Sequence, residues 1–126
     1  MPLQTVLLSS LTLAAGAEKR LLPGLDVSEY GRLHFHIASR GRAVAGLHAR
    51  VLFGTVVGPI TLLSDSTVWY EESTSERDFV HTVPLTDGST GFILSVPVVA
   101  PRLYDLILKN TGPKAIEDLY VTLLAK

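Results

Sequence analysis

The chain contains no cysteine, so disulfides, zinc–thiolate sites and cysteine nucleophiles are excluded. It also lacks the run of about 18 apolar residues that a membrane-spanning helix would need. Charged residues make up only 18% of the 126 residues, against 47% hydrophobic residues. A small domain this apolar has apolar surface left over once its core is filled. We expect a subunit contact to cover that surface.

Recognisable catalytic motifs are also absent. The sequence has no G-x-S-x-G, no H-E-x-x-H, no P-loop and no dinucleotide fingerprint. We therefore expect a protein that is not an enzyme and needs no cofactor. A group of arginines could meet phosphate, but no aromatic residues interleave with it and the net charge is −1, which argues against nucleic-acid binding. These arginines are Arg32, Arg40, Arg42 and Arg50.

The N-terminal segment from Val6 to Ala17 is similar to the core of a signal peptide. However, no Lys or Arg precedes Lys19, so the positively charged n-region is missing. We interpret residues 3–13 as a first strand instead. A virion or cytoplasmic location is favoured over secretion.

Turn residues interrupt apolar-rich segments along the whole chain. This rhythm predicts a single antiparallel all-β domain over residues 1–126, a jelly-roll-like β-sandwich of eight to ten strands. The breaks are Ala15-Gly16, Pro23-Gly24, Tyr30-Gly31, Gly41 to Gly46, Gly58-Pro59, Asp87-Gly88, Pro97 to Pro101 and Asn110 to Pro113.

The clearest alternation runs from residue 31 to residue 54. Leu33, Phe35 and Ile37 are predicted to face the core, with His34 and His36 between them on the wet face. Residues 47–53 alternate in the same way, and we expect the two segments to pair as a hairpin. Just before them, the Asp26 and Ser28 side chains are expected to bond nearby backbone amides in a turn.

Two further pairs of segments complete the strand prediction. Residues 78–85 and 91–96 flank a good hairpin connection at 86–90. Residues 103–109 and 116–125 form the last expected pair. Both look buried on both faces, which suits central strands or a strand covered by a partner, and Tyr104, Leu106 and Leu108 are expected to share one face. Residues 64–78 are the least strand-like and are interpreted mostly as a long loop.

Two stretches, LDVSEYGRLHFHI and RLYDLILKNTGPKAIEDLYVTLLAK, carry a resemblance. A turn followed by a strand near the start, and a strand, an N-T-G turn and an amphipathic last strand at the end, resemble small jelly-roll proteins of phage particles and bacterial surfaces. The resemblance implies a fold and carries no functional residue.

His34 and His36 are the best candidates for metal chemistry, because residues i and i+2 present two imidazoles on one strand face, as cupin-type barrels do. His48 could join them from the expected neighbouring strand, and His81 is a more distant option. The rest of the cupin pattern is missing. The alternation also places the pair beside Arg32 on the outer face, so we expect no bound metal.

Trp69 and Tyr70 form the second candidate site, with Asp65, Glu71 and Glu72 nearby. Exposed aromatics beside acids would suit a sugar. Alternatively, Trp69 fills the core or anchors an interface. The acidic stretch lacks the spacing of a calcium-binding EF-hand loop.

Charge is divided unevenly. Residues 1–50 hold six basic and three acidic side chains, and the remainder holds five basic and nine acidic ones. The halves could form complementary patches between subunits. The sequence thus predicts a non-enzymatic structural or docking protein that self-associates in a larger assembly, such as a phage particle accessory or tail component, with other assembly proteins as possible partners. A homo-oligomer is expected, with a trimer preferred. The alternative is a carbohydrate-binding module, with a glycan as partner, and the third hypothesis is a cupin-like metal enzyme.

Overall fold

The structure, a computed structural model, describes residues 2–40, 44, 46–55, 62–65, 69–71, 80–84 and 90–126. Every regular element in these ranges is a β-strand, which confirms the all-β prediction. None of the described segments forms a helix of the length and apolarity that crossing a membrane requires. The strands are β1 (Leu3–Leu8), β2 (Glu18–Arg20), β3 (Leu25–Asp26), β4 (Arg32–Ser39), β5 (Leu47–Gly54), β6 (Leu62–Asp65), β7 (Tyr70–Glu71), β8 (Val80–Pro84), β9 (Thr90–Pro97), β10 (Arg102–Asn110) and β11 (Leu119–Ala125).

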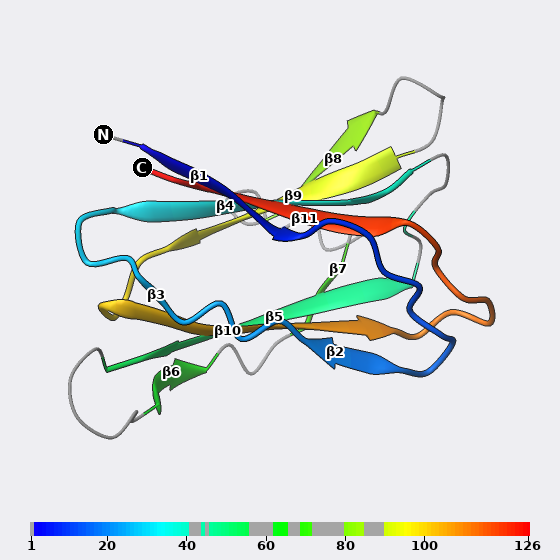
Figure 1. Ribbon diagram of the computed structural model, residues 1–126, viewed down its shortest axis with the longest axis horizontal. Coiled ribbons are helices and arrows are strands. Elements are labelled where there is room, and N and C mark those ends of the chain that lie inside the picture. The colour runs from blue at the N-terminus through cyan, green and yellow to red at the C-terminus, as the bar shows by residue number, and fades with distance from the viewer. Residues whose placement is uncertain are drawn as a thin grey trace.

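The strands form two antiparallel sheets that lie one above the other (Figure 1). The first sheet has five strands in the order β1-β11-β4-β9-β8. The second runs β2-β10-β5-β6, with β3 also paired to β10 and β7 to β5. The two chain ends lie side by side, because Leu3 pairs with Ala125 across β1 and β11.

Alternating apolar residues from both sheets fill the space between the layers. In β4 the inner side chains of Leu33, Phe35 and Ile37 are fully buried, as the alternation predicts. Burial of each such side chain is worth about 1.5–3 kcal/mol. Other fully buried members of this core are Leu47, Phe92, Leu94, Leu103, Leu106, Leu108, Leu119 and Leu123.

The predicted hairpin between residues 31 and 54 is wrong. β4 pairs with β11 and β9 in the first sheet, whereas β5 pairs with β10, β6 and β7 in the second. The chain therefore crosses from one layer to the other between these strands. Period-two alternation identifies the face of a side chain, and it contains no information on which strand lies alongside.

The predicted hairpin of residues 78–85 and 91–96 is present in the structure. β8 and β9 pair antiparallel, with Val80 opposite Leu94, which confirms the hairpin; residues 85–89 of its connection lie outside the described residues. β10 and β11 are interior strands, as expected, but they lie in different sheets, so their predicted pairing is wrong, and β11 is fully buried on one face only. The first strand ends at Leu8, earlier than predicted, and Leu13 makes only an isolated bridge to Ile116.

The grouping of Tyr104 with Leu106 and Leu108 is wrong. The register between β10 and β5 shifts between Leu103 and Asp105. Leu103 and Leu106 are therefore both fully buried although they are three residues apart, and Tyr104 between them stays partly exposed. An irregularity of this kind inserts a residue and breaks the alternation.

The turn at Asp26 is confirmed. The Ser28 hydroxyl and the Ser28 N–H both donate to Asp26 Oδ1, at 2.7 and 2.9 Å. These two hydrogen bonds favour the ionised carboxylate and lower the pKa of Asp26 below its ordinary value.

Candidate functional site: the outer face of the five-stranded sheet

The outer face of the five-stranded sheet collects side chains from four strands. On β4, β9 and β11 each lies between two buried residues of its own strand, and on β1 Gln4 and Val6 alternate with less exposed neighbours, so the alternation directs all of them away from the core. We define the outer face by its described members, namely Gln4 and Val6 of β1, Tyr120, Thr122 and Leu124 of β11, His34 and His36 of β4, and Ile93 and Ser95 of β9.

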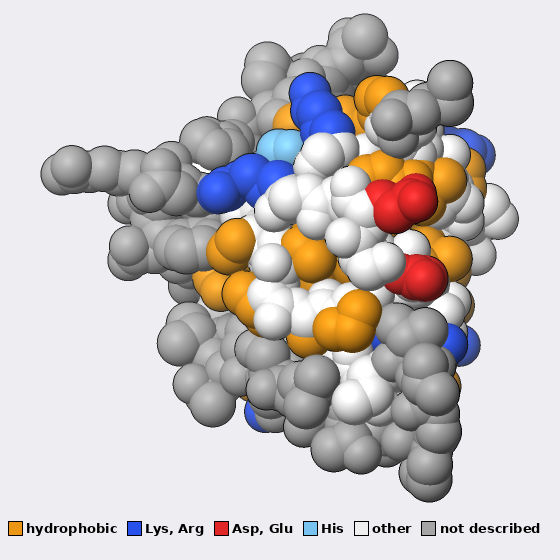
Figure 2. All heavy atoms as spheres, turned by 90° about the vertical axis from the view of Figure 1, so that its left-hand side faces the viewer, with side chains coloured by type: hydrophobic (Ala, Val, Ile, Leu, Met, Phe, Trp, Pro, Cys, Tyr) orange, Lys and Arg blue, Asp and Glu red, His pale blue; other side chains and the backbone are white. Residues whose placement is uncertain are grey.

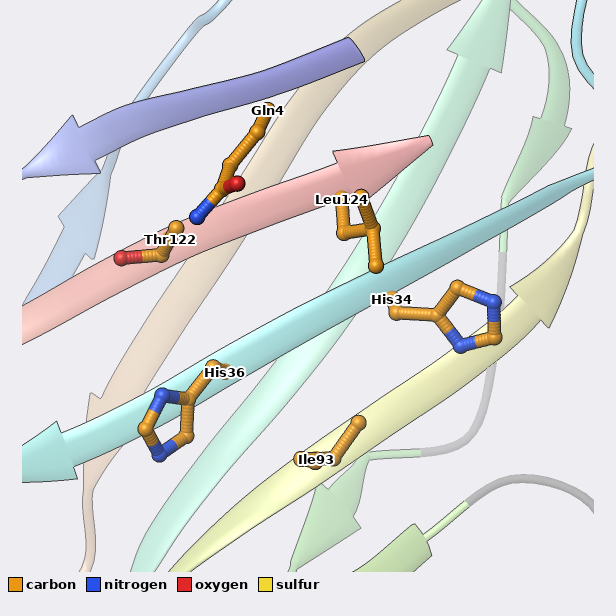
Figure 3. Close-up of a pocket in the computed structure, with 6 residues that line it drawn as sticks. All are labelled: Gln4, His34, His36, Ile93, Thr122 and Leu124. Carbon is orange, nitrogen blue, oxygen red and sulfur yellow. The ribbon is translucent and has the colours of Figure 1, made fainter. Parts of the chain in front are cut away.

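A shallow hollow of about 230 Å³ lies in the middle of this face. Figure 3 shows its six lining side chains arranged across β1, β11, β4 and β9. The register explains the grouping, because His36 lies opposite Thr122 on one side and opposite Ile93 on the other. The lining residues are Gln4, His34, His36, Ile93, Thr122 and Leu124.

The two histidines are held by their neighbours on the sheet. His34 Nδ1 lies 2.7 Å from the hydroxyl of Ser95, which the register places directly opposite. The His36 ring meets the Tyr120 ring edge-on, with centroids 5.6 Å apart and planes at 90°. His36 Nε2 is enclosed and has no hydrogen-bond partner among the residues that the structure describes.

Charge is missing from the middle of the outer face. None of its defining members is Asp, Glu, Lys or Arg. Described basic residues lie at its ends: Arg32 begins β4 and pairs through its backbone with Lys126, and Arg40 follows the end of β4 with its guanidinium carbon 5.7 Å from the Tyr120 ring centroid. Val6 adds an apolar side chain that is 61% exposed.

The opposite surface, on the second sheet, is strongly charged. Arg20 Nε donates to Asp105 Oδ2 at 2.6 Å, and Lys109 Nζ lies 3.7 Å from Glu18 Oε1. Strand β2 consists of three exposed charged residues. The end of the sandwich that carries both termini is mixed, with described hydrophobic, basic and acidic side chains interspersed (Figure 2).

Trp69 lies on the charged side of the molecule. Arg50 Cζ and Lys109 Nζ are each 5.7 Å from the centroid of its ring, which is the geometry of cation–π contacts. The Trp69 ring is only partly exposed. Tyr70 lies opposite Ala49 and packs against the core, and burial raises the pKa of its hydroxyl. The indole therefore lies beside two cationic side chains.

The remaining predicted site residues are only partly placed. The register puts Asp65 opposite Leu52 and Glu71 opposite His48, while Glu72 lies outside the described residues. His81 lies opposite Ile93 in the β8–β9 pair.

His48 does not join the other histidines, so this expectation is wrong. β5 belongs to the second sheet, and the alternation of this strand directs His48 away from the layer that carries His34 and His36. His34 and His36 face outward, whereas a cupin-type site would need them inside the barrel. In the described part of the chain no group of three or more His, Cys, Asp or Glu side chains could hold a metal ion.

Two buried polar residues were missed by sequence reasoning. Asp105 is fully buried and accepts hydrogen bonds from Arg20 and from the Leu22 backbone. Asn110 is also fully buried, and its amide nitrogen donates to the carbonyls of Leu13 and Lys114. The sequence contained one signal for the buried position of Asp105, because this acid lies within the apolar run from Leu103 to Leu108.

Comparison of the chain with protein-family models, curated proteins and solved structures returned no match.

Proposed function

We propose that the protein is a non-enzymatic structural component that works by self-association through the outer face of its five-stranded sheet. One observation carries the proposal: the described residues in the middle of this face include no charged side chain, and Arg32 lies at the end of β4, whereas the surface of the second sheet carries ion pairs and an all-charged strand. The centres of protein–protein interfaces are depleted in charged residues and enriched in aromatic ones. Tyr120, Ile93 and Leu124, which are partly exposed, fit that composition.

The strand order supports a jelly roll as the finer description of the fold. The first strand pairs with the last, β2 and β3 pair with the last but one, β4 pairs with β9, and β5 pairs with β6. Nested antiparallel pairing of this kind is what results when one long hairpin is rolled into two sheets. Together with the resemblance of the two quoted stretches, it supports a place in a larger assembly, such as a phage particle accessory or tail component.

Sedimentation velocity at micromolar concentration tests the proposal. The wild-type protein should sediment as an oligomer, with an interface of roughly 800 Å² or more per chain. Leu124→Asp puts a charge on the outer face and should yield smaller species, because an unpaired carboxylate in an apolar contact is costly. The strand signal in circular dichroism should persist.

The matched control is Ile107→Asp. Ile107 is a partly exposed side chain of β10 on the surface of the second sheet, opposite Arg50 and Arg20 in the strand register. This variant should keep the oligomeric state of the wild type. A wild-type protein that sediments as a monomer would refute self-association, and equal dissociation by both substitutions would refute the assignment to the outer face.

A further inference from the structure

Strand β1 is an edge of the five-stranded sheet. Among the described residues it pairs with β11 alone, so the N–H and C=O groups on its other side have no strand partner there. Such a row of N–H and C=O groups is a template for another strand, and proteins commonly block it with charged residues, proline, bulges or a covering segment.

The edge strands β1 and β2 of the two sheets differ in charge. The edge strand β2 of the second sheet reads Glu-Lys-Arg, and all three residues are exposed. Strand β1 reads LQTVLL and contains no charge and no proline. The absence of charge extends from residue 2 to residue 17. The one irregularity, a register shift between Val6 and Leu8, leaves a regular ladder from Leu3 to Val6.

We propose that β1 pairs antiparallel with β1 of a second copy, across a two-fold axis perpendicular to the sheet, so that the two five-stranded sheets become one continuous sheet. This inference rests on the proposed self-association and names its partner. A contact across such an axis is isologous, with the same strand contributed by both subunits. Two uncharged strands can meet in this way without electrostatic repulsion.

The proposed register places the axis within the regular part of β1. With Thr5 on the axis, Gln4 lies opposite the partner's Val6, and both of these side chains stay on the outer face. The exposed Val6 is then covered, and the outer faces of the two copies become contiguous. One strand pair buries less surface than a stable interface needs. The pair is confined to β1, because the chain beyond it turns to the second sheet, where the Gly16 N–H donates to the Asn110 carbonyl; side chains beside β1 must therefore complete the contact.

Cysteine cross-linking tests the register directly, because the chain has no cysteine of its own. Cα atoms of directly opposed residues lie about 4.5–5.5 Å apart, within the range that a disulfide spans. Thr5→Cys should therefore give covalent dimers under mild oxidation. A mixture of Gln4→Cys and Val6→Cys should cross-link more completely than either variant alone. Lys19→Cys on the edge strand β2 is the control and should stay uncross-linked.

A second test introduces a charge into β1. Val6→Lys should weaken dimerisation at least tenfold in sedimentation equilibrium, because two lysines then flank the axis. Val99→Lys is the matched control: Val99 is also strongly exposed, at 57%, but lies in the β9–β10 connection. It should leave the dimer intact.

The outcomes separate this inference from the function that it builds on. An oligomer that resists Val6→Lys and fails to cross-link at residues 4–6, yet dissociates with Leu124→Asp, would overturn β1 pairing and leave self-association standing. A closed trimer would do the same, because a two-fold contact cannot build one. A monomeric wild type would remove both.

Discussion

Asp105 is the residue on which the corner between β2 and β3 depends. Its fully buried carboxylate accepts from Arg20 Nε at 2.6 Å and from the Leu22 N–H at 3.0 Å. Leu22 adopts φ = 46°, in the left-handed region that residues other than glycine avoid. The second hydrogen bond thus holds a strained backbone position against the sheet.

Replacing Asp105 should therefore cost more than replacing its basic partner. Asp105→Ala leaves the Leu22 amide without its acceptor and should lower the free energy of unfolding by about 1–3 kcal/mol. Arg20→Ala should cost less, because the hydrogen bond from the Leu22 N–H to Asp105 remains and the Arg20 side chain is 51% exposed. Urea denaturation of both variants measures the difference. Equal losses would show that the ion pair, and not the backbone contact, is what matters.

At the scale of elements, the approach of β9 to β4 depends on a glycine. A Cβ added at Gly91 would lie 2.8 Å from the Ala38 Cβ and 2.9 Å from the Ile37 carbonyl oxygen. Backbone atoms cannot move aside as a flexible side chain can. The two strands that carry the histidines and Ile93 of the outer face therefore require Gly91 for their spacing.

Gly91→Ala should destabilise the protein by about 1–3 kcal/mol, the usual cost of overpacking. Gly31→Ala is the control, because a Cβ there meets only the Lys126 carbonyl oxygen, at 3.9 Å. That change should be neutral within about 0.5 kcal/mol or slightly stabilising. Thermal unfolding followed by circular dichroism compares the two, and a Gly91 variant as stable as the Gly31 variant would disprove the close approach.

On the scale of the whole molecule, both sheets bury their inner faces in one shared core. Side chains of β4 and β9 from one layer meet those of β5 and β10 from the other. The buried apolar side chains in the described part of the chain form one cluster, so the two layers should unfold together.

The substitution Ile37→Val tests whether the two layers unfold together. Ile37 is fully buried in β4, and the loss of one methylene should cost about 0.5–1.5 kcal/mol. Trp69, the only tryptophan, lies beside the second sheet and reports on that layer by fluorescence. In the Ile37→Val variant, the urea midpoint measured by Trp69 fluorescence should shift by the same amount as the midpoint measured by circular dichroism. Separate transitions for the two signals would indicate that the layers unfold independently.

The sequence by itself determined which way the residues of the regular strands face. Alternation in β4, β5 and β11 is a local property, because each pleat reverses the side-chain direction, and the buried residues of these strands agree with it. The hairpin of β8 and β9 and the turn at Asp26 were also predictable, since short-range turn chemistry specifies them.

Only the tertiary structure decided which strands lie together. It separated β4 from β5, shifted the register at Leu103 and so turned Tyr104 outward, and placed His48 far from its expected partners. Strand pairing is a contact between distant segments, and no local pattern encodes the partner. For the same reason the uncharged outer face, assembled from residues between Gln4 and Leu124, has no signature in any one segment of the chain.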